Sequence, residues 1–373
     1  MRHLRLYNRL FVIALVVLAA GCRSLPLPET EPAVEPDRPT VAAEVLRWRD
    51  GARSAASLTF DDSTLDHYLL AAPELDSRGL RGTFYAITGV LDEGIWHDGD
   101  IQRLQFSWSQ AREMAARGHE IGSHSHNHPD LTTLDLRATD RQLRQSMQRL
   151  RHEIPQQRGL TFAWPYWRSN SVGRALATHY YIAARAGQAT TARYIEAGVP
   201  GARPADLQRV NALAVRPVEA SQSWIEAAER VLDSEGWAVL SLHGVDDGRI
   251  PRAAVGWQPL SIETYRGLLD YLVGQDFWIA PFADVVKYIE RRDSTQLTVR
   301  QLDESSVSID ILCELDPSVY DIPLSLKLEL PRSWREVQIS ADGVALPWRS
   351  ASPAVQLELP LEAQRLTIWA IAD

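Results

Sequence analysis

The sequence predicts an α/β protein in which a parallel-stranded (β/α) barrel is followed by a small all-β sandwich. From about residue 45 to residue 292, short apolar runs alternate with longer runs whose apolar residues recur at helical spacing. Strands that alternate with helices pair in parallel, and roughly 250 residues suit a barrel whose active site collects at the carboxyl ends of its strands. After residue 292 the apolar residues recur at every second position, which is typical of half-buried antiparallel strands.

Ahead of the barrel, the chain begins with a segment typical of an export signal. Three arginines precede the apolar run "LFVIALVVLAA" at 10–20, which is too short to span a bilayer. Gly21 and Cys22 follow, and "LAAGC" resembles a bacterial lipoprotein box, with Ala19 where leucine is commoner. The resemblance implies a signal peptide over 1–22 and a lipid on Cys22. A plain secretory signal and a retained membrane anchor are the alternatives.

Residues 23–42 are rich in proline and acid and have no apolar period, so we interpret them as a linker. A lipid-anchored exported protein would lie in the bacterial cell envelope, at a membrane, on its periplasmic or outer side. The net charge of −9 becomes −12 once the three arginines of the signal are removed. An acidic chain gains nothing from long-range attraction to nucleic acid, so we expect no nucleic acid partner, and we infer no protein partner.

In the predicted barrel domain, 43–292, strands and helices follow one another in turn. The expected elements are, in order, a strand "AASLTF" (55–60), a helix (64–79), a strand "GTFYAIT" (82–88), a helix (108–118), a strand and loop "HEIGSHS" (119–125), and an amphipathic helix (138–154). Gly79 is a plausible end for the first of these helices.

The predicted sandwich domain, 293–373, has a different pattern. Alternating strands are expected at 306–315, 322–330, 354–361 and 365–371, and Asp342-Gly343 is expected to form a tight turn. Cys313 would then lie on an inner face as a small buried apolar residue. With Cys22 carrying lipid, Cys313 has no partner, so no disulfide framework is implied.

Two adjacent carboxylates end the first predicted strand of the barrel. Asp61 and Asp62 follow "SLTF", where a barrel presents its catalytic groups. Neighbouring strand residues point in opposite directions, so one carboxylate could bind a metal while the other acts as a base. The alternative is an Asx-type turn or a helix cap.

Histidines follow two further predicted strands. "GHEIGSHSHNHPDL" (118–131) places His124, His126 and His128 at alternate positions, and imidazole is a common ligand of transition metals. A solvated polar turn is the alternative. His243 follows the apolar run "VLSL" and is either a proton donor, a ligand or a structural histidine.

Taken together, these motifs carry a resemblance that none of them carries alone. "TFDD" (59–62), the histidine segment at 118–131, "WPY" (164–166) and "LSLH" (240–243), in this order, resemble the polysaccharide deacetylases of carbohydrate esterase family 4, the NodB-homology family. The resemblance covers roughly 45–290. It implies a deformed (β/α) barrel of the NodB-homology type as the catalytic domain, and a hydrolase acting on carbon–nitrogen bonds other than peptide bonds.

The resemblance also implies roles for individual residues. Asp61 would be the catalytic base, and Asp62 would bind one divalent metal ion together with His124 and His128. Zinc is the expected ion, with cobalt, nickel or manganese as alternatives. The backbone N–H of Tyr166 would stabilise an oxyanion, and His243 would be the general acid. His126 would then be no ligand.

The expected chemistry is removal of N-acetyl groups from a polysaccharide. Three protein ligands leave open positions on the metal, where a water can be bound and made more acidic for attack on an acetamide carbonyl. Asp61 would take the proton of that water, and His243 would protonate the departing amine. The alternatives are an O-acetyl esterase or a non-sugar amide hydrolase using the same site, or an envelope lipoprotein that binds glycan without turnover.

The sequence departs from the family's pattern near the base. The family often has an arginine before Pro-Tyr to pair with the base, but Phe162 and Ala163 stand there, and Arg185 is our suggested replacement, against the alternative of an ordinary surface arginine. Ser63 stands where glycine is commoner, and no Asp-x-x-Asp-Trp-like element is found. Trp164 and Trp167 could pack against a sugar ring, with burial in the core as the alternative.

Overall fold

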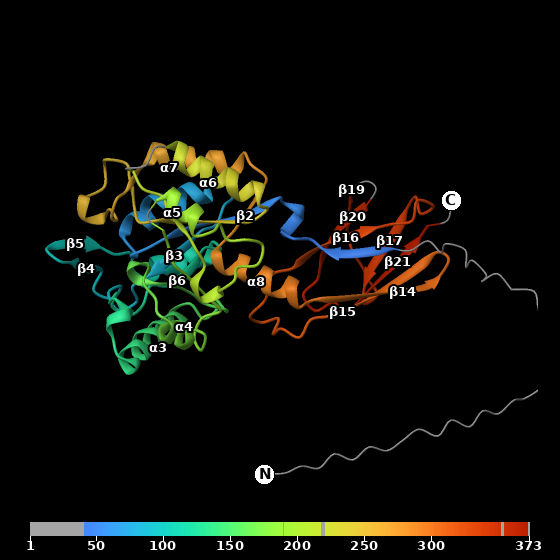
Figure 1. Cartoon of the computed structure of the whole chain (residues 1–373), viewed down its shortest axis with the longest axis horizontal. Coiled ribbons are helices and arrows are strands. Elements are labelled where there is room, and N and C mark those ends of the chain that lie inside the picture. The colour runs from blue at the N-terminus through green and yellow to red at the C-terminus, as the bar shows by residue number, and fades with distance from the viewer. Residues whose placement is uncertain (1–40, 189, 218–220, 352–353, 372–373) are drawn as a thin grey trace, which may run out of the picture. The chain divides into compact units, whose positions relative to one another are not determined.

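The computed structural model describes residues 41–188, 190–217, 221–351 and 354–371, which fall within one compact unit, Pro39–Asp373 (Figure 1). The predicted signal peptide, Cys22 and almost all of the predicted linker lie outside the described residues. Across the described ranges, no helix combines the length and the apolar character needed to cross a bilayer.

A parallel sheet that curls on itself forms the first body of the fold. Its strands are β2 (Ser54–Phe60), β3 (Thr83–Ala86), β6 (Glu120–Ser123), β7 (Thr161–Ala163), β8 (Ala183–Arg185), β9 (Leu213–Ala214), β10 (Trp237–Leu242) and β13 (Phe277–Ile279). They run in the order β8-β7-β6-β3-β2-β10-β9, with β13 beside the start of β2. The N–H of Ala186 donates to Val210 O (2.9 Å), and the N–H of Val210 donates to Ala184 O (2.9 Å). These bonds join the two edges, which confirms the predicted (β/α) barrel.

Helices cover the outside of the barrel (Figure 1). They are the π-helix η2 (His67–Ala71), α1 (Ala72–Asp76), α2 (Trp108–Ala116), α3 (Leu136–Glu153), α4 (Ser171–Ala177), α5 (Thr191–Glu196), α6 (Ser221–Asp233), α7 (Ile262–Val273) and α8 (Phe282–Ser294). Single turns of 3-10 helix are η1 (Arg49–Gly51), η3 (Leu131–Thr133), η4 (Pro165–Trp167), η5 (Leu207–Arg209) and η6 (Arg252–Ala254). Short strands in loops are β4 (Ile95–Asp98), β5 (Ile101–Leu104), β11 (Val245–Asp246) and β12 (Leu260–Ser261).

The first predicted helix, 64–79, is present over residues 65–76, but it is not α-helical throughout. Leu65 and Asp66 are α-helical, the chain then runs as a π-helix from His67 to Ala71, and it ends as the short helix α1. Pro73 has no N–H to continue an α-helical ladder, which accounts for the change of hydrogen-bond pattern just before it. By contrast, α3 follows its prediction, because the Asp135 carboxylate caps its first turn through Ala138 N–H (2.7 Å).

Side chains alternate between the two faces of the barrel strands. Leu58 and Phe60 of β2 belong to the core under the helices, whereas Ser57 and Thr59 lie on the other face, and all four are buried. On β6, a Cβ at Gly122 would lie 2.5 Å from the Tyr85 ring. Glycine at this position therefore leaves room for a tyrosine inside the barrel.

The second body is an all-β sandwich, as predicted. One antiparallel sheet is β14 (Gln296–Asp303), β15 (Ser306–Leu312), β21 (Arg365–Ala370), β17 (Val337–Ala341) and β18 (Val344–Ala345). The other is β1 (Ala42–Val45), β16 (Leu324–Glu329), β20 (Ala354–Leu359) and β19 (Arg349–Ala351). Asp342 and Gly343 have φ of 45° and 87° and form the predicted turn between β17 and β18.

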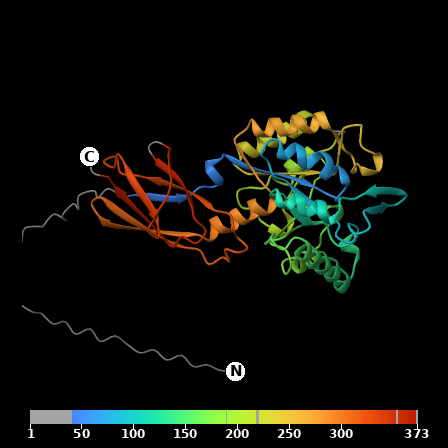
Figure 2. The same cartoon turned by 180° about the vertical axis from the view of Figure 1, so that it is seen from behind.

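The chain does not divide cleanly at one point between barrel and sandwich. The predicted barrel domain begins at residue 43, whereas β1 pairs with β16 of the sandwich, with Ala42 opposite Glu329. Both views show β1, in blue, among the red C-terminal strands (Figures 1 and 2). At the other boundary α8 continues to Ser294, and its Tyr288 side chain packs in the core of the sandwich.

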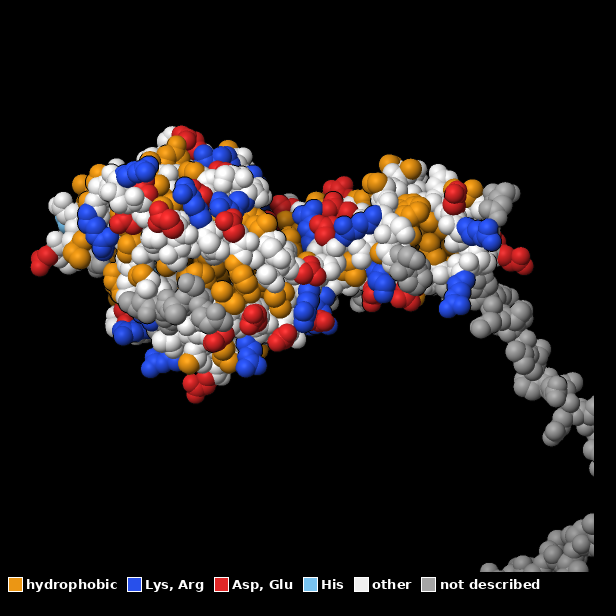
Figure 3. Space-filling model, turned by 90° about the horizontal axis from the view of Figure 1, so that it is seen from above, with side chains coloured by type: hydrophobic (Ala, Val, Ile, Leu, Met, Phe, Trp, Pro, Cys, Tyr) orange, Lys and Arg blue, Asp and Glu red, His pale blue; other side chains and the backbone are white. Residues whose placement is uncertain are grey.

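Cys313 is half-buried and follows the last residue of β15, so the prediction of a buried residue on an inner face is wrong. On the face shown in Figure 3, acidic and basic side chains are intermixed. The negative net charge is therefore not gathered into a single acidic field on that face.

Candidate active site

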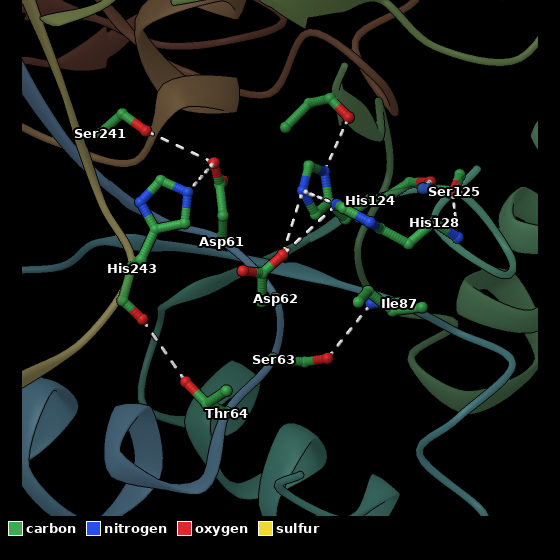
Figure 4. A network of polar contacts seen from close by, with 12 residues as sticks. Asp61, Asp62, Ser63, Thr64, Ile87, His124, Ser125, His128, Ser241 and His243 are labelled. Atoms are coloured by element: carbon green, nitrogen blue, oxygen red, sulfur yellow. Dashed lines mark hydrogen bonds and ion pairs between the residues drawn. The ribbon is translucent and has the colours of Figure 1, made fainter. Parts of the chain in front are cut away.

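The carboxyl ends of five barrel strands bring the predicted site residues together. Asp61 and Asp62 follow β2, His124 follows β6, Tyr166 follows β7, Arg185 ends β8, and His243 follows β10. Figure 4 shows the two aspartates between His243 on one side and the His124–His128 pair on the other. Residues far apart in the sequence thus meet at one edge of the sheet, as a parallel barrel requires.

Asp62, His124 and His128 form a group with the dimensions of a metal site. One ligand atom from each lies within 4.8 Å of the others, and all three residues are buried. Asp62 Oδ1 lies 3.5 Å from His124 Nε2 and 3.4 Å from His128 Nε2. The two Nε2 atoms lie 3.2 Å apart and point at each other. One carboxylate and two imidazoles that converge in this way are suitable ligands for a divalent cation.

The chemical state of the histidines fits this interpretation. His124 Nδ1–H donates to the Ala163 carbonyl (2.9 Å), which leaves the Nε2 lone pair directed at the site. Burial lowers the pKa of His128 to about 4, so its imidazole is neutral at neutral pH, as a ligand must be. Burial opposes the charged form of His124 too, but the carboxylates of Asp61 and Asp62 outweigh it and raise the pKa of His124. The site therefore attracts positive charge.

The loops that hold these residues have an unusual backbone. Left-handed φ values of 52–76° occur at six non-glycine residues of the three motif loops: Asp62, Ser63, Ser125, His128, Tyr166 and Trp167. In one loop the Ser125 hydroxyl accepts the N–H of His128 (2.8 Å) and closes the turn that carries both histidines. Strained backbone of this kind persists where the surroundings fix it, and it is common at functional sites.

Arg185 holds the carboxylate of Asp61. Both residues are buried, and Arg185 Nη2 donates to both Asp61 oxygens, at 2.6 Å for Oδ2. Arg185 Nη1 donates to Ser241 Oγ (2.9 Å), which lies 3.4 Å from Asp61 Oδ2. Burial raises the pKa of Asp61, but the charge of Arg185, aided by His124 and His243, lowers it below its usual range. Asp61 is thus an ionised carboxylate in a buried position.

This placement decides between the two interpretations of Arg185. The side chain is fully buried, so it is not a surface arginine, and it stands where a replacement for the missing arginine would have to stand. It is not among the residues that line the cavity described below, so it is not placed to bind substrate directly. Arg185 reaches the substrate only through Asp61.

His243 lies on the opposite side of Asp61 from the group of Asp62, His124 and His128, which we call the metal-type group. Its Nε2 is 3.8 Å from Asp61 Oδ2, and its side chain is 13% exposed. Burial lowers the pKa of His243, against the opposing effect of the two aspartates. The backbone is fixed as well, because His67 Nε2–H donates to the His243 carbonyl (3.0 Å). The imidazole can therefore exchange a proton with a group bound in front of Asp61.

A cavity of about 440 Å³ opens above these residues. Besides the polar groups, it is lined by Trp96, Trp164, Tyr166, Trp167, Arg216 and Trp257. A larger hollow, of about 1020 Å³, lies against the sandwich and contains none of the predicted catalytic or ligating residues. The predicted catalytic and ligating residues therefore lie in the smaller cavity, at the carboxyl edge of the barrel.

The burial of two tryptophans corrects one prediction and leaves another standing. Trp164 is fully buried, and its indole N–H donates to the Gln208 carbonyl (2.8 Å), so it is a core residue and not a platform for sugar. Trp167 is half-buried, with its ring 6.3 Å from that of His243, and remains a candidate. His126 Nδ1 contacts the Thr88 hydroxyl (3.2 Å), away from the three converging donors.

The sequence analysis missed Trp96, Arg216 and Trp257. The rings of Trp96 and His128 lie 5.0 Å apart, and those of Trp257 and His243 lie 5.2 Å apart. No motif marks these tryptophans, since neither follows a strand of the barrel sheet. Their only signal in the sequence is a large aromatic residue close to a glycine in a segment without period.

Comparison with known proteins supplies a family for part of the chain. A family model described as polysaccharide deacetylase matches residues 49–184. A protein of a Bacillus species named gellan lyase is 26% identical over 325 residues, and the match covers 82% of this chain but 12% of that protein. The chain therefore spans only a small part of the length of this relative.

Two solved structures are also similar. The deacetylase PplD of Streptococcus pyogenes, in complex with acetate, is 24% identical, with a TM-score of 0.37 over 46% of this chain and 68% of that one. A family 4 carbohydrate esterase of Streptomyces lividans, in complex with acetate, is 16% identical, with a TM-score of 0.39 over 61% and 91%. The family assignment rests on the sequence match, which ends before Arg185 and His243.

Proposed function

Residues 49–184 belong to the polysaccharide deacetylase family, and from this premise we propose that the chain is a metal-dependent hydrolase that removes N-acetyl groups from an N-acetylated polysaccharide. The family match supports a deacetylase-type hydrolase of amide bonds, with acetylated glycan as the class of substrate. The metal, the N-acetyl group and the roles of individual residues are our proposal.

The observation that carries the proposal is that two adjacent carboxylates face different groups. Asp62 faces His124 and His128, whereas Asp61 faces Arg185 and His243. One carboxylate is thus placed to bind a cation and the other to accept a proton. Amide hydrolysis by a water molecule needs both within one small cavity.

The residues that would hold the ion are Asp62, His124 and His128, and zinc is the expected ion, with cobalt, nickel or manganese as alternatives. When bound, such an ion acts as a Lewis acid on the acyl carbonyl and lowers the pKa of a water molecule. Three ligands from the protein leave room for the substrate and that water.

The remaining steps are assigned to groups of this chain. Asp61, held ionised by Arg185, accepts a proton from the attacking water. The backbone N–H of Tyr166, in the turn that follows β7, stabilises the oxyanion of the tetrahedral intermediate. His243 donates a proton to the departing amine, which is a poor leaving group without it. Acetate and a free amino sugar result.

The proposal also covers the cell biology of the chain. We propose that it is exported and carries a lipid on Cys22, in the bacterial cell envelope, on the basis of the signal-like residues 1–22. Labelling of the whole protein with a radioactive fatty acid tests this directly. Label on the wild type and none on Cys22→Ala would support the anchor, and equal label on both would refute it.

The experiment on the reaction uses residues 41–373, wild type and Asp61→Asn. It measures metal content and the release of acetate and of free amine from N-acetylglucosamine oligomers, O-acetylated xylan and gellan, the glycan in the name of the Bacillus relative. Acetate and amine in equal amounts from the first substrate, lost in Asp61→Asn with metal retained, would support the proposal. Acetate without amine from an ester substrate would indicate an O-acetyl esterase.

Two further outcomes are distinct. Binding of oligosaccharide without release of acetate from any substrate would favour a glycan-binding protein. Protein that holds no divalent metal after reconstitution would refute the assignment of Asp62, His124 and His128.

A further inference from the structure

Two tryptophans of the cavity come from segments outside the barrel sheet. Trp96 lies on β4 of the hairpin formed by β4 and β5, and Trp257 lies in the loop between η6 and β12. Both indole rings are partly exposed, with Trp257 43% exposed. The two rings contact different histidines of the site: Trp96 contacts His128, and Trp257 contacts His243. The two rings thus border the metal-type group and the proton donor respectively.

A single buried arginine connects the two segments. Arg103 of β5 lies directly opposite Trp96 in the hairpin register, so their side chains share one face of the ribbon. Its Nη1 donates to Val255 O (2.6 Å) and lies 3.5 Å from Gly256 O, and these carbonyls immediately precede Trp257. Arg103 is 5% exposed. Arg103, the cross-strand neighbour of Trp96, therefore bonds directly to the segment that precedes Trp257.

The loop that carries Trp257 is also fixed from below. The buried carboxylate of Asp66 accepts the N–H of Val245 (2.6 Å) and the N–H of Gly256 (3.2 Å). A Cβ at Gly256 would lie 1.8 Å from the His243 carbonyl oxygen, so the loop passes against the backbone of His243 itself. Asp66 thus sets where Gly256 lies, and Arg103 sets how the loop faces the hairpin.

We propose that Arg103 is a positioning residue that holds Trp96 and Trp257 as the two walls of a subsite for one sugar ring of the substrate. The inference rests on the proposed function, because it takes His243 as the group that protonates the amine. Trp257, beside His243, packs on the ring that carries the leaving nitrogen, and Trp96, beside His128, borders the acyl group. Indole faces are suited to the apolar faces of pyranose rings.

The chemistry of arginine suits this task. Its planar guanidinium presents several N–H donors in a fixed arrangement and can serve two consecutive carbonyl groups, whereas lysine offers one compact ammonium group. Without Arg103, the carbonyls of Val255 and Gly256 lose their donor while Asp66 still holds the N–H of Gly256. The expected change is a displaced Trp257 wall in a folded protein.

The test compares Arg103→Met with wild type in the full-length, metal-loaded enzyme on N-acetylglucosamine oligomers. We expect KM to rise about tenfold, the equivalent of about 1.4 kcal/mol of lost binding, with kcat within about threefold and metal content unchanged. Arg103→Lys should recover part of the loss. Arg252→Met is the matched control, because Arg252 lies on the same loop with its side chain 69% exposed, and we expect wild-type constants.

A double-mutant cycle with Trp257→Ala tests the connection itself. If Arg103 acts through Trp257, the two changes together should raise KM hardly more than either alone. Additive effects on KM, or a fall in kcat at unchanged KM, would overturn the proposal. Should Arg103→Met not fold, the cycle is run with Arg103→Lys in its place and is read in the same way.

Failure of the proposed function would look different. Calorimetric titration of Asp61→Asn with an oligomer measures the affinity of the subsite without turnover. If wild type releases no acetate but Arg103→Met in the Asp61→Asn background weakens binding about tenfold, the subsite stands and the hydrolase does not. If binding is unchanged there, the subsite is refuted whether or not acetate is released.

Discussion

Asp61 and Glu120 are both buried carboxyl groups of the same barrel, at opposite ends of its strands, and the protein treats their charge in opposite ways. Asp61 follows the end of β2 and faces the guanidinium of Arg185, which keeps its pKa low despite burial. Glu120 begins β6, and its pKa is raised by burial. Its oxygens accept hydrogen bonds from the hydroxyls of Thr83 (2.8 Å) and Thr161 and from Ala283 N–H (2.8 Å).

The difference separates chemistry from architecture. At the carboxyl end, an ionised base, a strained backbone and a cavity lie together. At the amino end, a carboxyl group without an arginine fastens the start of α8 to the strands. At the carboxyl end the negative charge of Asp61 is needed, whereas at the amino end Glu120 is needed as a hydrogen-bond acceptor. Substitutions at matched positions can break or sharpen this contrast.

The largest effect is expected for Asp61→Asn. The amide keeps the shape of the side chain but cannot accept the proton of the attacking water. Acetate release should fall by about 10³-fold or more, while metal content stays at the wild-type value. A variant that keeps activity within about tenfold of wild type would remove Asp61 from the role of base.

Arg185→Met should come next. It leaves the Asp61 carboxylate buried without its cation, which costs about 3–5 kcal/mol of unfolding free energy, and it frees the base from its fixed orientation. We expect a loss in kcat of about 100-fold with metal retained, and partial recovery in Arg185→Lys. Chemical denaturation gives the first quantity, and steady-state kinetics give the second. Equal kcat values for Met and wild type would contradict the role of Arg185 as the support of the base.

Glu120→Gln is the matched change at the other end and should do little. Its amide oxygen can accept from Thr83 and Ala283 while its NH₂ donates to Thr161, so the unfolding free energy should stay within about 1 kcal/mol of wild type. Activity should stay within about twofold. Urea denaturation and acetate release check both, and a loss of activity comparable to that of Asp61→Asn would erase the contrast between the two ends.

The last expected effect is on stability alone, at Asp284, which lies close to Glu120 in the first turn of α8. Burial raises its pKa to about 7 from 3.8; the charged groups around it are Lys287, Glu120, Asp321 and Arg49. The folded state therefore binds more protons than the unfolded state between about pH 4 and pH 7, so the stabilisation from this group is lost as pH rises through that window.

Asp284→Asn should remove this loss. Because the side chain is only half-buried, we expect the variant to gain roughly 1–2 kcal/mol relative to wild type on going from pH 5 to pH 8. Urea denaturation at the two pH values measures the difference. A gap between variant and wild type that is the same at both values would show that Asp284 titrates normally.

The sequence predicted the barrel, the sandwich and the residues that face each other at the site, because local periods and strand ends determine them. It could not predict which of two nearby tryptophans enters the core. Trp164 and Trp167 differ because Tyr166 and Trp167 adopt left-handed backbone, which turns the chain between them. It also gave no sign of Trp96 and Trp257, whose positions depend on Arg103 and Asp66 binding a distant loop. Contacts between segments with no common period are invisible in a single sequence.

The pairing of β1 with β16 has a consequence for how the chain acquires its fold. β1 lies at the start of the described chain, and its partner in the described sheet is β16, so the pair cannot form until residues 324–329 have been synthesised. Contacts between residues so distant in sequence form slowly, and one sheet of the sandwich cannot close before residues 324–329 have left the ribosome. The barrel can form early, whereas the sandwich is completed last, with the first strand recruited by the final ones. A nascent chain of this design keeps that sheet incomplete, and so within reach of chaperones and proteases, until residues 324–329 are available.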